Sequence, residues 1–370
     1  MSLSRNPEAL GAIAFAEQCL SLLDEASYNT TYKFAVLLAL MDLVVEKANY
    51  DGTLATMITT KQLATKVVEN YWRHVRAYPA LQAQPLQGKS GQAEIITSIC
   101  QFRETTNFAS IFYVRQNYAA KYQALINKVE KKLIEMPLPR LQYFGKQERR
   151  FIYDISWSMT NRVDLKQVTA YQRNQVSSFD NSIQLLPNVA DYLVNLNGLL
   201  RPMIQRAWAM QVAKMNQLEE SKLQHFLFGH ERSAIHRFVA PLQDLQNNRC
   251  FYCESTFKGQ AKQKPEVDHF IPWARYPNDG LANFVLAHSE CNNSKSDHFA
   301  SLDHLAKWRS RNGDRLQLRE LSNIAHQHKW ELLEQSSVSV ANVLYGRLQA
   351  GTELWQGKGV FVEYGVSLGV

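Results

Sequence analysis

The sequence has few cysteines and no long hydrophobic run, and each shortage excludes a class of protein. Five cysteines among 370 residues are an odd number, and too few for a small fold held together by disulfides. The most apolar run, residues 34–45, is too short to cross a bilayer and contains Asp42, so it predicts a buried helix. The N-terminus lacks the pattern of a signal peptide. We therefore expect a soluble protein of the reducing cytoplasm.

Acidic residues are fewer than basic residues, and histidines are scarce in the first part of the chain. The chain has 41 lysines and arginines against 34 acidic residues, and its formal charge of +7 mildly favours an anionic partner such as nucleic acid. Of the ten histidines, only His74 precedes residue 225. This clustering predicts that any metal chemistry lies in the C-terminal part of the chain.

The length allows two or three domains, each large enough to bury its own core. Residues 1–218 are predicted to form a mainly helical region, with a sub-boundary near the proline-rich break at 136–148. Residues 219–335 would form a second domain, and residues 336–370 a C-terminal helix and tail. The expected fold class is mainly α with a small α+β module.

Apolar residues recur at spacings of three and four over most of the first two hundred residues, which predicts helices there. Alternating apolar residues predict strands at 149–157 and 182–186. The helix at 189–214 is expected to be interrupted or kinked near Pro202, and the tail is expected to add a strand or to wrap back onto another domain. The predicted helices cover 10–23, 32–45, 61–78, 93–104, 111–134, 189–214, 219–246, 300–311, 316–333 and 338–349.

The end of the third predicted helix interleaves basic and aromatic residues: Trp72, Arg73, His74, Arg76 and Tyr78. Two interpretations stay open. These side chains would contact a nucleic-acid backbone. Alternatively, the cations complement the dipole at the C-terminus of the helix while Trp72 packs inward.

Three of the five cysteines fall at spacings that suit a metal. Cys250 and Cys253 form a C-x-x-C pair, and His288 with Cys291 repeats the same gap. Four such ligands in two pairs are what a tetrahedral structural zinc requires. Alone, a C-x-x-C pair is often only two buried thiols, so the prediction depends on both pairs occurring together.

Four further polar residues lie between these pairs or directly after them: Asp268, His269, Asn283 and Asn292. They cannot all bind the zinc, because four ligands already complete its coordination. Carboxylate and amide oxygens beside an imidazole predict a second, catalytic metal site.

The stretch 250–297 resembles the HNH endonuclease family, whose core is a ββα-metal fold. The resemblance rests on the two ligand pairs, the DH-x-x-P segment at 268–272, Asn283 in a Leu-Ala-Asn context, and the CN-x-x-K-S-D segment at 291–297. One departure is His288, which stands where many relatives have cysteine and which zinc accepts readily. The resemblance covers roughly fifty residues and implies nothing about the rest of the chain.

The resemblance assigns a role to each matching residue. His269 would be the general base, and Asp268 and Asn292 would bind a catalytic Mg²⁺ or Mn²⁺. Asn283 would fix the loop and orient His269. Lys295 would contact a phosphate, with a solvated charge as the alternative. The zinc would be structural, because the hairpin is too short to bury a core.

These observations predict a metal-dependent HNH endonuclease that cleaves DNA, with a helical region that selects the substrate or regulates cleavage. A role in restriction or phage defence is expected by analogy. One alternative is a zinc-stapled nucleic-acid or protein adaptor with a vestigial nuclease site. A third possibility is a subunit of a larger defence complex, in which the helical region binds a partner protein.

Overall fold

The computed structural model describes residues 7–24, 29–49, 51–107, 110–229, 232–258 and 263–365. It divides the chain into two compact units: unit 1 comprises residues 1–47 and 54–229, and unit 2 comprises residues 48–53 and 230–370. The predicted fold class is confirmed, since helices dominate and the sheets are small. No helix in the described ranges is long and apolar enough to span a membrane. The functional division predicted at residue 218 stays a prediction.

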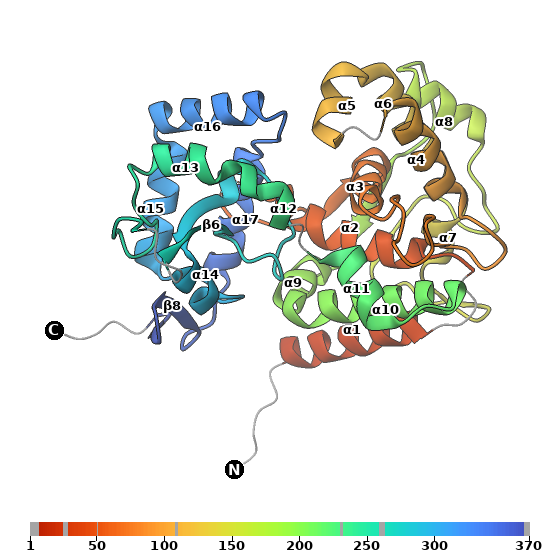
Figure 1. Ribbon diagram of the computed structural model, residues 1–370. Helices are drawn as coiled ribbons and strands as arrows, with labels where there is room; N and C mark the ends of the chain where they lie inside the picture. Colours follow the sequence, from red (N-terminus) through yellow and green to blue (C-terminus); the bar gives the residue numbers. More distant parts are fainter. Residues whose placement is uncertain are drawn as a thin grey trace, which may run out of the picture. The chain divides into compact units, whose positions relative to one another are not determined.

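Unit 1 is built around α2, whose residues from Tyr32 to Val45 are all buried. The run predicted to be a buried helix is therefore at the centre of the N-terminal core (Figure 1). Other helices surround it, and most of them match the predicted ranges within a few residues. The helices of unit 1 are α1 Pro7–Asp24, α2 Tyr32–Glu46, α3 Thr60–Trp72, α4 Glu94–Thr105, α5 Ile111–Asn117, α6 Ala119–Glu135, α7 Pro137–Arg140, α8 Leu165–Gln172, α9 Val189–Asn195, α10 Asn197–Asn216 and α11 Glu220–Phe228.

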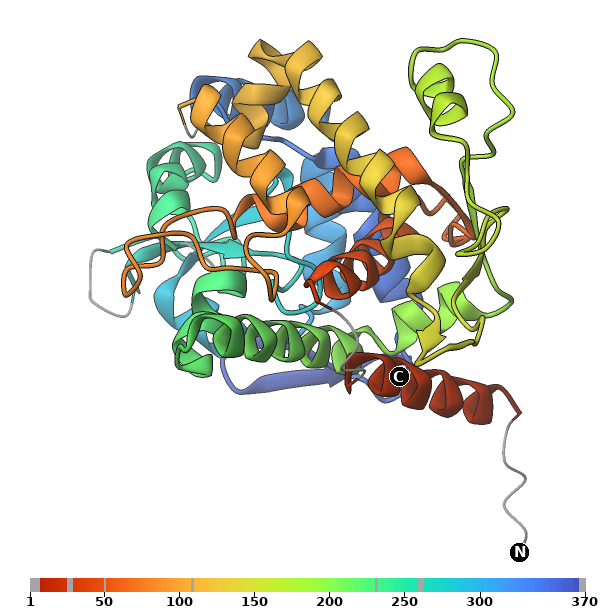
Figure 2. The same ribbon diagram turned by 90° about the vertical axis from the view of Figure 1, so that its right-hand side faces the viewer.

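Helix α3 packs beside α6 and α2 (Figure 2). A capping box between Thr59 and Gln62 begins it, but it ends at Trp72, six residues before the predicted end at Tyr78. The Arg103 guanidinium donates to the carbonyl oxygens of Trp72, at 2.8 Å, and Val75, at 3.0 Å, and so caps this end. Trp72, His74 and Tyr78 are buried. Trp72 therefore packs inward, as the second interpretation held, and His74 and Tyr78 are buried as well, which that interpretation did not predict.

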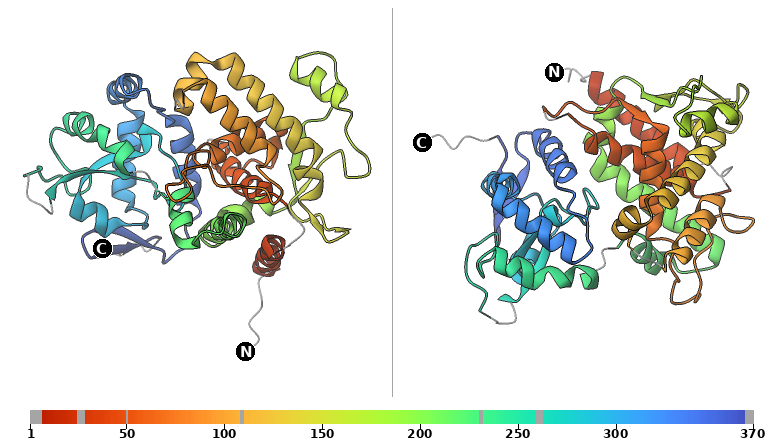
Figure 3. Two further views of the ribbon diagram at one scale, coloured as in Figure 1. Left: turned by 45° about the vertical axis from the view of Figure 1, so that its right-hand side comes forward. Right: turned by 90° about the horizontal axis from the view of Figure 1, so that it is seen from above.

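The strand predicted at 149–157 forms only as β4, Tyr153–Asp154. Its shortness has a local cause, because the Gln142 side-chain oxygen accepts hydrogen bonds from the backbone N–H groups of residues 151, 152 and 153. A side chain thus replaces a neighbouring strand. β4 joins a three-stranded antiparallel sheet in the order β1 (Met57–Thr59), β5 (Ser182–Leu185), β4. A separate hairpin pairs β2, Tyr143–Phe144, with β3, Gln147–Glu148. Irregular segments flank α8 (Figure 3).

Unit 2 contains two hairpins, and helices cover the first of them. Phe238, Leu242, Phe284, Leu286 and Leu321 are fully buried in one apolar cluster that joins the hairpin to α13 and α16. The C-terminal tail adds strands, which was the first of its two predicted alternatives, and supplies nearly all of a hairpin of β8 (Glu353–Gly357) and β9 (Val360–Glu363). The elements of unit 2 are α12 Arg232–Ile235, η1 His236–Phe238, α13 Val239–Leu245, β6 Pro265–His269, η3 Leu281–Asn283, β7 Phe284–His288, α14 Ser289–Lys295, α15 Leu302–Gly313, α16 Arg315–Gln327, α17 Glu334–Gly346, β8 Glu353–Gly357 and β9 Val360–Glu363.

A buried ion pair joins the central helix of unit 1 to α10. The Arg201 guanidinium lies 2.5 Å from the Asp42 carboxylate, and Arg201 Nε also donates to Asn197 Oδ1 at 3.3 Å. This anchor lies next to Pro202, which the helix includes, and the chain breaks instead at Leu196, between α9 and α10. The interruption of the predicted helix therefore lies at Leu196, six residues before the proline.

We predict that Arg201→Ala lowers the free energy of unfolding by about 3–5 kcal/mol, because it leaves the Asp42 carboxylate buried without its cation. The matched control is Arg206→Ala on the same helix. Arg206 pairs with Glu220 at an exposed site, and its loss should cost about 1 kcal/mol or less. Denaturant unfolding followed by circular dichroism measures both, and equal costs would contradict the role assigned to Arg201.

Candidate active site

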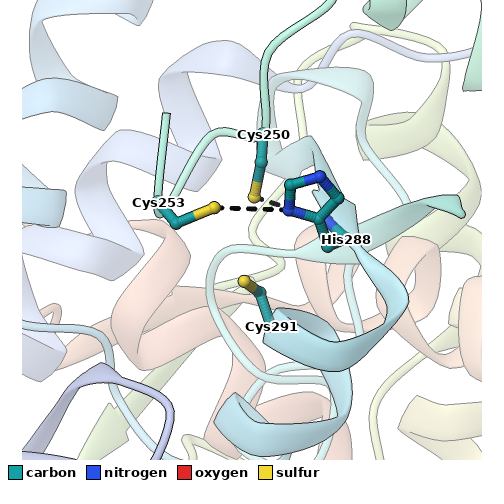
Figure 4. A group of neighbouring side chains, drawn as sticks. All are labelled: Cys250, Cys253, His288 and Cys291. Atoms are coloured by element: carbon teal, nitrogen blue, oxygen red, sulfur yellow. Dashed lines mark hydrogen bonds between the residues drawn. The ribbon is translucent and has the colours of Figure 1, made fainter. Parts of the chain in front are cut away.

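The four predicted zinc ligands converge in unit 2. Cys250 and Cys253 lie in the turn after α13, His288 ends β7, and Cys291 lies in α14. Their ligand atoms all lie within 4.8 Å of one another, and they point toward a common centre (Figure 4). Cys253 Sγ is 3.3 Å from His288 Nδ1.

This donor set fits zinc. Three sulfurs and one imidazole nitrogen in a tetrahedron around zinc would stand roughly 3.5–4 Å apart, close to the span observed. The hydrogen bond with the Cys291 thiol lowers the pKa of Cys250 to about 5, and the same contact raises the pKa of Cys291. One thiolate is thus favoured already, and binding of a metal would favour the others.

The antiparallel register of β6 and β7 sets the distance from this cluster to His269. Pro265 pairs with His288, and His269 pairs with Phe284. One end of the ladder therefore carries a zinc ligand and the other end carries His269. Four residue steps, about 13 Å of strand, separate them.

Alternation along β6 determines which side chains face α14. Glu266 and Asp268 share one face of the strand, and His269 lies on the other. α14 packs against the first face. There Asn292 Nδ2 donates to Glu266 Oε2 at 2.9 Å, and Lys295 Nζ lies 3.1 Å from Asp268 Oδ2.

Asp268 is buried and strongly held. Its Oδ2 accepts a hydrogen bond from the Tyr252 hydroxyl at 2.5 Å as well as from Lys295. Burial raises the pKa of Asp268, and the ammonium of Lys295 and the hydroxyl of Tyr252 oppose that rise. Because Tyr252 lies between Cys250 and Cys253, it connects the turn that carries two of the predicted zinc ligands to Asp268.

Lys295 is fully buried, which neither alternative for this residue anticipated. Its ammonium also donates to the carbonyl oxygen of His269 at 2.9 Å. It therefore joins α14 to the end of β6 from inside the module. The contact with a phosphate that was expected of Lys295 stays a prediction.

His269 is buried, and its Nε2 lies 2.9 Å from Asp279 Oδ1. The rings of Trp273 and Phe284 pack edge-on against its imidazole, with centroids 5.2 and 5.0 Å away. These contacts fix the plane of the ring. A carboxylate beside an imidazole is also the arrangement that stabilises its protonated form.

Asn283 holds the backbone that follows His269. Its side chain is fully buried, and its Oδ1 accepts from the Ile271 N–H at 2.8 Å. Its Nδ2 donates to the carbonyl oxygens of Ile271, at 3.3 Å, and Asn278, at 3.2 Å. It therefore joins the segment after β6 to the loop before β7, which is the position that a loop-fixing asparagine needs.

Three residues of this arrangement were not predicted: Tyr252, Glu266 and Asp279. For Glu266 a signal existed, because the period of two along a strand places it on the same face as Asp268. Asp279 is ten residues from His269 in an irregular loop, where no spacing rule applies. Tyr252 lies between two cysteines, and the metal-binding pattern assigns no role to the residues between them.

Two family models match different parts of the chain. Residues 250–301 match the family described as HNH endonuclease, and residues 16–227 match the family described as Domain of unknown function (DUF8808). No curated protein matches the chain significantly. Because the second match spans more than half of the sequence, the protein belongs to the DUF8808 family, and it carries an HNH endonuclease domain with a Cys/Cys/His/Cys cluster.

Proposed function

We propose that the protein is a metal-dependent endonuclease that hydrolyses phosphodiester bonds in DNA. The main support is the arrangement around β6, within the residues that match the HNH endonuclease family. His269 lies at the end of this strand and contacts the Asp279 carboxylate. Side chains with oxygen atoms that can bind a metal lie between the same strand and α14. The excess of lysine and arginine supports a nucleic-acid substrate. The choice of DNA follows the resemblance described above.

In this proposal His269 accepts the proton of the attacking water. An imidazole is the side chain suited to this work near neutral pH. The Asp279 carboxylate orients the ring and stabilises the imidazolium that forms. Asn283 keeps the backbone of the site in place by joining the segments on either side of it.

The residues on the α14 side of β6 fit a hard divalent ion. Asn292 contributes an amide oxygen, and Asp268 and Glu266 contribute carboxylates, the donors that Mg²⁺ and Mn²⁺ prefer. When bound, the ion would stabilise negative charge on the phosphate and on the leaving oxygen. Lys295 and Tyr252 hold Asp268 in its orientation, and Glu266 holds Asn292.

One observation favours the adaptor alternative. Tyr252 and Lys295 occupy Asp268 Oδ2, as they would in a module that keeps its fold without cutting. Metal-dependent cleavage separates the two functions. We further propose that the DUF8808 region directs the nuclease to its target, alone or with a partner protein, in restriction or phage defence.

The first prediction from the proposed function concerns the zinc. The purified protein should contain one zinc per chain, and Cys291→Ser should lose it and unfold unit 2, because zinc clamps the hairpin to α14. Metal analysis and limited proteolysis measure the two effects. Cys100→Ala in unit 1 is the control and should keep the zinc. Full zinc content in Cys291→Ser would contradict the site.

The second prediction concerns the base. With Mg²⁺ or Mn²⁺ the protein should nick or cut plasmid DNA, and His269→Ala should reduce the rate by about 10²–10⁴-fold, with zinc content unchanged. His298→Ala replaces an exposed histidine of the same unit and should cut normally. Parallel assays on RNA and single-stranded DNA define the substrate class. Wild-type rates in His269→Ala would remove His269 from the mechanism.

The third prediction concerns Asp279 as a positioning residue. Asp279→Asn should lower kcat by about 10–100-fold, because one charge-assisted hydrogen bond to the imidazole is weakened. KM should stay within about twofold, since Asp279 is not expected to touch the substrate. Steady-state kinetics on a labelled oligonucleotide measure both. A rise in KM alone would show instead that Asp279 acts in binding.

A further inference from the structure

Unit 1 contains a cavity of about 380 Å³. It lies among the start of α2, the loop at 88–93, the start of α4, the end of α6, and α7. All these elements belong to one compact unit. The volume is within the range of pockets that hold small ligands. Nothing in the nuclease chemistry of unit 2 accounts for it.

The loop that lines part of the cavity has the sequence Gly-Lys-Ser-Gly at residues 88–91, and its conformation is constrained. A side chain at Gly88 would meet the carbonyl oxygen of Gly91 at 2.7 Å, and Gly91 has a φ of +121°, so both positions require glycine. Gln87, fully buried, anchors the loop by accepting from Thr31 Oγ1 and Trp208 Nε1, each at 2.8 Å.

The backbone of this loop offers hydrogen-bond donors. Among the described residues, the N–H groups of Ser90, Gly91 and Gln92 donate to no protein acceptor. The Tyr32 hydroxyl, also in the lining, accepts from the Ile95 N–H at 3.0 Å, so its own proton remains to be donated. Consecutive backbone N–H groups in a tight turn form a concave site for an anion.

The side chains that line the cavity are strongly basic. The lining residues include four basic side chains, Lys33, Lys89, Lys132 and Arg140, and one acidic side chain, Glu94. Lys33 is almost completely buried, with its ammonium held by the carbonyl oxygens of residues 22 and 23 at the end of α1. Glu94 pairs with Lys132 at 2.5 Å. The lining therefore has an excess of three positive charges.

Apolar side chains also line the cavity. Met136, at the junction of α6 and α7, is substantially exposed, whereas Pro137 and Leu141, also in the lining, are buried. A cavity that combines cations, N–H donors and apolar side chains suits a ligand with an anionic group and a partly apolar body. An anionic group would lie against the loop, and the volume of the cavity leaves room for a body the size of a nucleotide.

We propose that this cavity binds a phosphate monoester attached to a nucleotide-sized body. Phosphate is the anion whose several oxygens match a mixture of lysine, arginine and backbone N–H donors. Two sources have this chemistry: a free nucleotide and the 5′-phosphorylated end of a nucleic acid. The site gives the DUF8808 region a ligand of its own, and it does not depend on unit 2 being a nuclease.

The test uses the full-length His269→Ala protein, so that cleavage does not affect binding. One pair of probes is N-methylanthraniloyl-AMP and the same fluorescent adenosine without phosphate. The other is a 3′-fluorescein hexanucleotide with and without a 5′ phosphate. Fluorescence anisotropy should show that the phosphate strengthens binding about tenfold or more in at least one pair. The pair that responds identifies the source of the ligand.

Two variants locate the bound phosphate. Lys89→Glu and Arg140→Ala should each weaken binding of the phosphorylated probe about 10–100-fold. Lys128→Glu, an exposed lysine of α6 outside the cavity, should not change it. Thermal melting checks that every variant is folded. The proposal is overturned if the phosphate makes no difference in either pair, or if folded Lys89→Glu and Arg140→Ala bind the probe like the parent protein.

Discussion

The register of the β6–β7 hairpin is the constraint on which the rest of the nuclease unit depends. A slip of one residue would turn Glu266 and Asp268 away from α14 and bring His269 toward it. The metal cluster at one end of the hairpin and the buried Asn283 at the other end oppose such a slip. His288 joins the metal cluster, and Asn283 ties the chain after His269 to the loop before β7. A five-residue ladder is too short to specify its own pairing without such anchors.

The same constraint connects structure to chemistry. Tyr252 belongs to the metal-binding turn and contacts Asp268, while Lys295 contacts both Asp268 and the carbonyl oxygen of His269. Disturbing the cluster would therefore reach the candidate active site through these two side chains. Unit 1 is stabilised separately, by the buried α2 helix and its ion pair with α10, and the phosphate site that we propose there is built on this independent core.

The sequence was sufficient where a rule links residue spacing to geometry. Paired ligands predicted the metal cluster, and the apolar run at 34–45 predicted the central helix, because both signals are local. The residues that were missed act across loops. The side chain of Gln142 accepts backbone hydrogen bonds where a neighbouring strand was expected, and Asp279 contacts His269 from an irregular segment. Lys295 was expected to contact a phosphate or to be solvated, and its burial beside Asp268 was missed because only the fold brings these two residues together.

The reaction that we propose at His269 requires a divalent ion on the α14 side of β6. A titration of Mn²⁺ followed by electron paramagnetic resonance on the zinc-loaded protein measures this site. We predict one Mn²⁺ site per chain, retained in His269→Ala and lost in Asn292→Ala, with the zinc content of both unchanged. Equal Mn²⁺ binding by wild-type protein and a folded Asn292→Ala variant, or no binding by either, would contradict it.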